Sequence, residues 1–174
     1  MLHMERDRES EIKRAAELWH SGEPYEAGRI IFEGLPEEVR PAWATGILHL
    51  VLERTGVKLK QIDRLLEIVD RPEEWRKAHQ VFSSIRGQTL KWDELAKHEL
   101  TTEQRALGYV LELAELVAKV TYNATDPDDE FDEDSGWGIA SILRNFVDRL
   151  NDENFAQVAW LALSKEPPTV KEVR

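Results

Sequence analysis

Residues 101–122, which read TTEQRALGYVLELAELVAKVTY, decide the fold of this chain. Thr101 and Gln104 have the spacing of a capping box, in which each side chain bonds the backbone N–H of the other residue at the start of a helix. The residues that follow are apolar on one helical face and on much of a second one, which leaves a thin polar stripe. A helix with so wide an apolar surface is buried on more than one side. We therefore predict a central apolar helix at 102–122.

Most of the remaining chain shows the same helical spacing of apolar residues, interrupted by Gly and Pro. Gly56 and Gly87 are expected to end helices, and Asp70 with Glu73 repeats the capping-box spacing. Few stretches alternate long enough to form strands. We predict helices at about 9–20, 24–34, 41–54, 59–69, 72–87, 92–98, 135–150 and 152–166. The predicted fold class is all-α, with about eight helices in an irregular packed array of helical hairpins.

This pattern predicts a single all-α domain over residues 1–166. Its start at 1–8 is expected to fray, an acidic loop is expected at 123–135, and 167–174 should form a loose C-terminal tail. The segment Gly22-Glu23-Pro24-Tyr25-Glu26-Ala27, closed by Leu35-Pro36, resembles one hairpin of a tetratricopeptide repeat. No second copy follows at the 34-residue period of that family, so we do not expect a solenoid.

Composition excludes several classes of protein. The chain has no cysteine, which rules out disulfides, a thiol nucleophile and cysteine-ligated metal sites. Its apolar runs are too short to span a bilayer, and its charged first residues do not resemble a secretion signal. Serine nucleophile elbows, phosphate-binding loops, dinucleotide fingerprints and helical pairs of zinc-binding histidines are also absent. We expect a soluble, cytoplasmic protein.

The net charge of −11 is concentrated in the C-terminal part of the chain. Residues 101–174 hold 15 acidic and 7 basic residues, a net of −8, against −3 for the first hundred. Such a charge disfavours nucleic acids and anionic membranes, and it favours a partner with a basic surface. The plain alternative is that the acidity serves solubility alone.

Seven of the nine residues in Asp126–Asp134 are acidic, which marks this stretch as a candidate binding loop. It lacks the glycine and glutamate spacing of an EF-hand calcium loop. One interpretation is a solvated loop whose last carboxylates stabilise the start of the following helix. The other is a binding pocket with aromatic and glycine residues close by, formed by Asn123, Asp132, Asp134 and Trp137.

Glu112 and Glu115 stand three residues apart on the central helix, a spacing that lets two carboxylates share a divalent ion. The Glu112-Leu113-Ala114-Glu115 motif resembles that of the all-α nucleotide pyrophosphohydrolases of the MazG type. That resemblance implies a second acidic pair on a later helix, for which this chain offers Asp148 and Asp152. Mg, Mn or Ca would then bind at Glu112, Glu115 and Asp148. The plain alternative is a solvent-facing stripe in which Glu115 pairs with Lys119.

The six tryptophans fall mostly on apolar helical faces, so core packing is their first interpretation. From these observations we expect a non-enzymatic α-helical interaction module or regulator that presents an acidic C-terminal face to a basic partner protein and needs no cofactor. The alternative is a divalent-metal-dependent hydrolase of nucleotides or phosphate esters. A homodimer built on surplus apolar helix surface is compatible with either.

Overall fold

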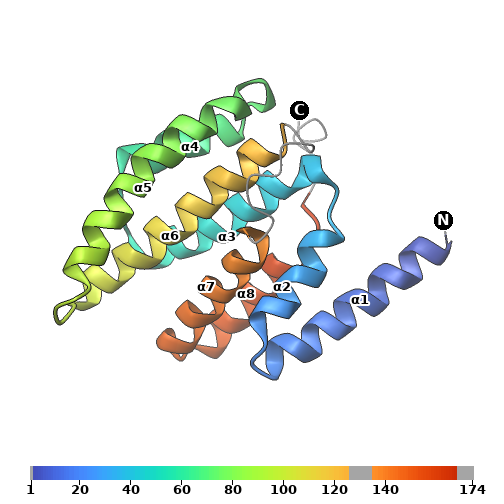
Figure 1. The fold of residues 1–174 in the computed structure, drawn as a ribbon. Helices are drawn as coiled ribbons and strands as arrows, with labels where there is room; N and C mark the ends of the chain where they lie inside the picture. Colours follow the sequence, from blue (N-terminus) through green and yellow to red (C-terminus); the bar gives the residue numbers. More distant parts are fainter. Residues whose placement is uncertain (1, 126–134, 168–174) are drawn as a thin grey trace.

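The computed structural model describes residues 2–125 and 135–167, and within them the chain forms eight α-helices, two short 3-10 helices and no strands (Figure 1). The predicted all-α class is therefore confirmed. In chain order the elements are α1 (Leu2–His20), α2 (Pro24–Glu33), η1 (Glu37–Val39), α3 (Arg40–Thr55), α4 (Lys60–Val69), η2 (Pro72–Lys77), α5 (Ala78–Leu95), α6 (Thr102–Asn123), α7 (Ser135–Leu150) and α8 (Glu153–Ser164). None of these helices is both long enough and apolar enough to cross a membrane.

The helix α6 is central, as predicted, and it packs against α5, α3 and α7 (Figure 1). The predicted capping box is present at its start. Gln104 donates its backbone N–H to Thr101 Oγ1 at 3.2 Å, and Thr101 donates its own to Gln104 Oε1 at 3.0 Å. Buried apolar side chains of all eight α-helices join one core cluster around this helix.

The prediction that Gly87 ends a helix is wrong, because α5 runs through it to Leu95. The left-handed backbone expected of a glycine stop occurs, among the described glycines, at Gly22 and Gly56. The helix continues beyond Gly87 because its later residues pack on α6. Trp92, for example, lies against Gly108 and donates its indole N–H to the Gln104 carbonyl at 2.8 Å. The separate helix predicted at 92–98 is the end of α5.

The second predicted capping box, at Asp70 and Glu73, is also absent. Asp70 follows the last residue of α4, and the 3-10 helix η2 begins after Arg71 without a side-chain cap. Trp75 explains this geometry, because it is buried and donates its indole N–H to the carbonyl of Val69 at 3.0 Å. The bulky side chain thus tightens the connection into a turn against the end of α4.

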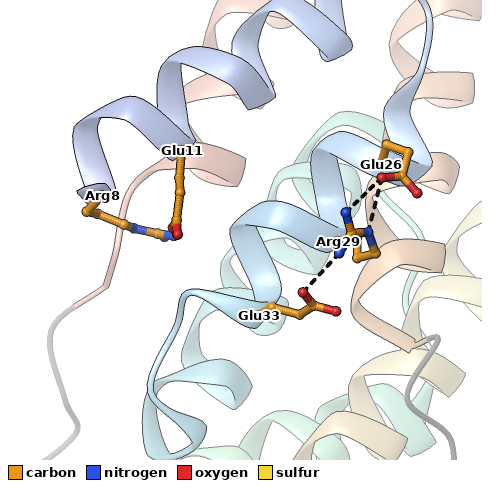
Figure 2. Close-up of polar contacts among 5 residues, drawn as sticks. All are labelled: Arg8, Glu11, Glu26, Arg29 and Glu33. Atoms are coloured by element: carbon orange, nitrogen blue, oxygen red, sulfur yellow. Dashed lines mark hydrogen bonds and ion pairs between the residues drawn. The ribbon is translucent and has the colours of Figure 1, made fainter. Parts of the chain in front are cut away.

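The helix α1 begins at Leu2, so the helix start predicted near residue 9 is too late. Arg8 donates a hydrogen bond to the Ile31 carbonyl of α2 at 3.4 Å. It also pairs with Glu11 at 3.4 Å, and Figure 2 shows these two side chains next to each other on α1. On α2 itself, Arg29 lies between Glu26 and Glu33, at 3.0 and 3.1 Å (Figure 2). The hydrogen bond that Arg29 donates to Glu26 is the main reason that the pKa of Arg29 is raised. Such exposed pairs contribute little to stability.

Candidate functional site

The structure describes two of the four residues predicted to form a pocket beside the acidic segment. Asp132 and Asp134 lie outside the described residues. Asn123 is the last residue of α6, and Trp137 lies in the first turn of α7. The Trp137 ring packs edge-on against Tyr25 of α2, with 5.3 Å between the ring centroids. Its buried indole N–H has no acceptor among the described residues.

The glycines around Trp137 bring helices together. A Cβ on Gly136 would overlap the ring of Phe32, and one on Gly28 of α2 would overlap the Cβ of Ala140. A Cβ on Gly138 would lie 3.1 Å from Leu116 of α6. These glycines therefore allow the close approach of neighbouring helices. The start of α7 is pinned between α2 and α6.

Glu115 does not belong to a solvent-facing stripe, contrary to the plain alternative for the α6 carboxylates. Its side chain is buried, with 6 % of the residue exposed, and its Oε1 accepts a hydrogen bond from Arg86 Nη1 of α5 at 2.8 Å. The ammonium group of Lys119 lies 5.2 Å from the ring centroid of Phe82. An ion pair with Arg86 thus replaces the predicted pair with Lys119.

The three carboxylates of the metal hypothesis lie in different surroundings. Burial, followed by the charges of Asp93 and Glu115, raises the pKa of Glu112. Asp148 is exposed on α7 and pairs with Arg144 at 3.0 Å. Within 2–125 and 135–167, no group of three His, Cys, Asp or Glu side chains is arranged to hold a metal ion. The metal site that the MazG-type resemblance implies at Glu112, Glu115 and Asp148 stays a prediction.

A different feature stands out in the described structure: a groove of about 660 Å³ between α7 and α8, bounded by the last turn of α1. We call it the α7–α8 groove. Its residues are Trp19 and His20 of α1, Arg144, Val147 and Asp148 of α7, Asn151 and Asp152 of the connection, and Glu153, Ala156, Gln157, Trp160 and Leu161 of α8.

Aromatic rings line the α1 side of this groove. The ring of Trp160 lies 6.1 Å from those of both Trp19 and His20, between centroids. Within the described chain, neither Trp19 nor Trp160 donates its indole N–H to a protein acceptor, whereas three other tryptophans donate theirs to backbone carbonyls. The α1 side of the groove is therefore an aromatic surface formed by Trp19, His20 and Trp160.

Arg144 ties α7 to the end of α1. It donates to the carbonyl of Trp19, its guanidinium lies 5.2 Å from the centroid of a Trp19 ring, and its Nε bonds Asp148. The carbonyls of the last turn of a helix lack partners within the helix, so an arginine is well suited to this position. The contact holds Trp19 in place beside Trp160.

Carboxylates stand around the apolar part of the groove. Asp152 caps α8, accepting hydrogen bonds from the N–H groups of Asn154 and Phe155 at 3.0 and 3.2 Å, and it also pairs with Arg54 at 3.4 Å. Asp152 is thus the N-cap of α8. Glu153 and Asp148 are exposed. The rim is acidic, and Arg144 is the cation among the groove residues.

Sequence reasoning missed this groove because it assigned the tryptophans to core faces. In the last helix, 46 % of Val158 and 60 % of Leu161 are exposed. The signal was present in the spacing, since Ala159 and Leu163 define the buried face and Leu161 does not lie on it. Comparison with known proteins adds nothing to this description: no family model, no curated protein and no solved structure matches the chain.

Proposed function

We propose that this chain is a non-enzymatic α-helical interaction module that binds a partner protein with a basic surface through the α7–α8 groove. The observation that carries the proposal is the groove itself, where Trp160 and the exposed Leu161 adjoin the carboxylates of Asp148 and Glu153. Protein interfaces are built in this way, from a few aromatic or aliphatic anchors inside a polar rim.

The charge of the chain supports a basic partner. At a net charge of −11, the chain attracts cationic surfaces and repels polyanions over about a Debye length. Such attraction mainly raises the rate of association, and salt weakens it. We therefore expect that salt weakens the binding and that the binding depends on the apolar anchor formed by Trp160 and Leu161.

Site-directed cross-linking tests this proposal. A photo-cross-linking amino acid replaces Leu161 in one variant and Leu90 in the control, because Leu90 is similarly exposed, at 51 %, but lies on α5. In the source cells, we expect a basic protein to be cross-linked at position 161 and not at position 90. The purified pair should then bind about tenfold or more weakly at about 300 mM than at about 50 mM salt. Equal labelling at both positions, or an acidic product, would contradict the proposal.

Thermal unfolding of chelator-stripped protein tests the metal-dependent hydrolase. An ion present at about 100 times its dissociation constant adds about 2.7 kcal/mol of stability, which is several degrees in Tm for a chain of this size. We expect that none of Mg²⁺, Mn²⁺ and Ca²⁺ raises the Tm by this amount. A rise in Tm that Glu112→Ala abolishes would favour the hydrolase over the interaction module.

A further inference from the structure

We infer that the occupant of the α7–α8 groove is an amphipathic helix of the partner, with apolar side chains along one face and Lys or Arg beside them. The inference rests on the proposed function and specifies the kind of segment that the groove accepts. Three features of the groove support this inference: the helical spacing of its lining residues, the internal hydrogen bonding of its backbone groups and the positions of its charges.

The groove follows one face of each of two consecutive helices. Counted from Arg144, the lining residues of α7 and the connecting residue Asn151 stand at positions i, i+3, i+4 and i+7. Counted from Glu153, the lining residues of α8 stand at positions i, i+3, i+4, i+7 and i+8. Asn151, in a left-handed conformation, and Asp152 join the two helices in a tight αα-hairpin. At 1.5 Å per residue, each wall is about 10 to 12 Å long, which is about two turns of a helix. A third helix can lie along such a trough.

The inner side of the same hairpin is already filled. Phe146 of α7 packs edge-on against Phe155 of α8, with 5.5 Å between centroids, and also against Tyr109 of α6 at 5.4 Å. These contacts place the hairpin on the core and leave its groove face without a covering helix among the described elements. The neighbouring Val158 and Leu161, each about half exposed, extend the apolar surface that a partner helix would cover.

The backbone of the groove favours a helix over an extended peptide. An extended segment binds well where it can add to a sheet edge, because its own N–H and C=O groups then find partners. The described part of the chain has no strand, and the walls of the groove are helices whose backbone groups are bonded internally. A helical ligand brings its own backbone hydrogen bonds and needs only side-chain complementarity.

The charges select the flanks of that helix. Val147, Ala156 and Trp160 provide the apolar surface, and Asp148 and Glu153 stand on opposite walls. A bound helix with apolar residues at i, i+3 or i+4, and i+7 would place its neighbouring side chains against these carboxylates. Lys or Arg at those positions forms favourable pairs, whereas Asp or Glu is repelled. The same repulsion disfavours a second copy of this acidic chain.

An NMR titration of the full chain with designed peptides tests the inference. The first peptide is an amphipathic helix of about 14 residues, with Leu on one face and Lys or Arg on its flanks. The second has the same sequence except that one central residue is replaced by Pro, which breaks the helix. We expect the first peptide to shift the amide signals of α7 and α8 and the indole signal of Trp160, and to bind about tenfold more tightly than the second.

Variants of the chain locate the binding. Leu161→Glu should weaken the helical peptide by about tenfold, because it replaces the exposed apolar anchor with a carboxylate that would lose its water against the Leu face of the peptide. The matched control Leu90→Glu should change binding less than twofold. Both positions are exposed, so both variants should fold. Equal weakening by the two variants would overturn the inference.

The remaining outcomes separate the two proposals. If the Pro-containing peptide binds as tightly as the helical one, the groove accepts extended basic segments, and the inference falls while the proposed function stands. If neither peptide binds, the inference also falls, and cross-linking at position 161 decides the proposed function independently. If the chain is a dimer that Leu161→Glu dissociates, a second copy occupies the groove and the inference is wrong.

Discussion

Glu115 accepts a charged hydrogen bond from Arg86, the contact that joins the polar sides of α5 and α6. Arg86→Ala would leave this buried carboxylate without that partner. We expect this variant to lose about 1–3 kcal/mol of the free energy of unfolding. The loss should be smaller than for a fully buried ion pair, because 51 % of the Arg86 side chain is exposed. Urea unfolding measures the change in the free energy of unfolding. Arg64→Ala, which removes an exposed pair with Glu67, is the control and should cost under about 1 kcal/mol. Equal costs would show that burial of Glu115 is unimportant.

Glu112 should make stability depend on pH. Its pKa is raised above the ordinary value of 4.5 by burial and then by Asp93 and Glu115, so the folded chain keeps this proton to a higher pH than the unfolded chain. The free energy of unfolding therefore falls as pH rises from the ordinary pKa through the raised one. We expect Glu112→Gln to raise Tm at pH 7 and to lose this advantage below pH of about 4.

Thermal scans of Glu112→Gln across this pH range make the measurement, with Glu99→Gln, an exposed side chain before α6, as the control. A gain in Tm that is the same at both ends of the range would contradict the origin assigned to it. The sequence placed both α6 carboxylates on one polar stripe but gave no sign of this difference between them. Arg86 lies 29 positions before Glu115, and only the packing of α5 on α6 brings it near.

At the scale of elements, two of the glycines inside helices, Gly28 of α2 and Gly87 of α5, should respond oppositely to replacement by alanine. A Cβ on Gly28 would overlap Ala140, so Gly28→Ala should cost about 1–3 kcal/mol by forcing α2 from α7. A Cβ on Gly87 meets nothing within 4 Å, and Gly87→Ala should gain about 0.5–1 kcal/mol from better helix propensity. Chemical denaturation of both variants measures the two effects. A loss at Gly87 would mean that α5 ends there, as the sequence suggested.

The helices themselves were largely predictable, and the exceptions have local causes. The capping residue Thr101 and the helix stop at Gly56 act through neighbouring residues, so their sequence patterns were sufficient. Gly87 and Asp70 have equally suggestive patterns, but contacts from α6 and from Trp75 override them. Local signals fail where a tertiary contact offsets the cost of about 1 kcal/mol that a glycine or a missing cap imposes.

At the scale of the whole molecule, the groove could not be found from sequence because its parts come from both ends of the chain. Trp19 and Trp160 are 141 positions apart, yet their rings lie 6.1 Å apart. Each has the spacing of a core residue on its own helix, and Arg144 looks like an ordinary surface charge. What sequence does provide is the acidity of the C-terminal part, which led to the expectation of a basic partner. The position of the apolar anchor within that acidic part required the fold.

The shared core leads to a final prediction, which concerns cooperativity. Buried side chains of all eight helices belong to one cluster, from Trp19 of α1 to Leu163 of α8, so no described helix has a core of its own. We expect the chain to unfold in one transition, with the same urea midpoint by far-UV circular dichroism and by tryptophan fluorescence. Trp19→Phe and Trp75→Phe each remove one fluorescent side chain, at two distant places in the core. For each variant, the urea midpoint from fluorescence is compared with the midpoint from circular dichroism. Different midpoints by the two methods in either variant would reveal two independently folding units and contradict the single domain predicted over 1–166.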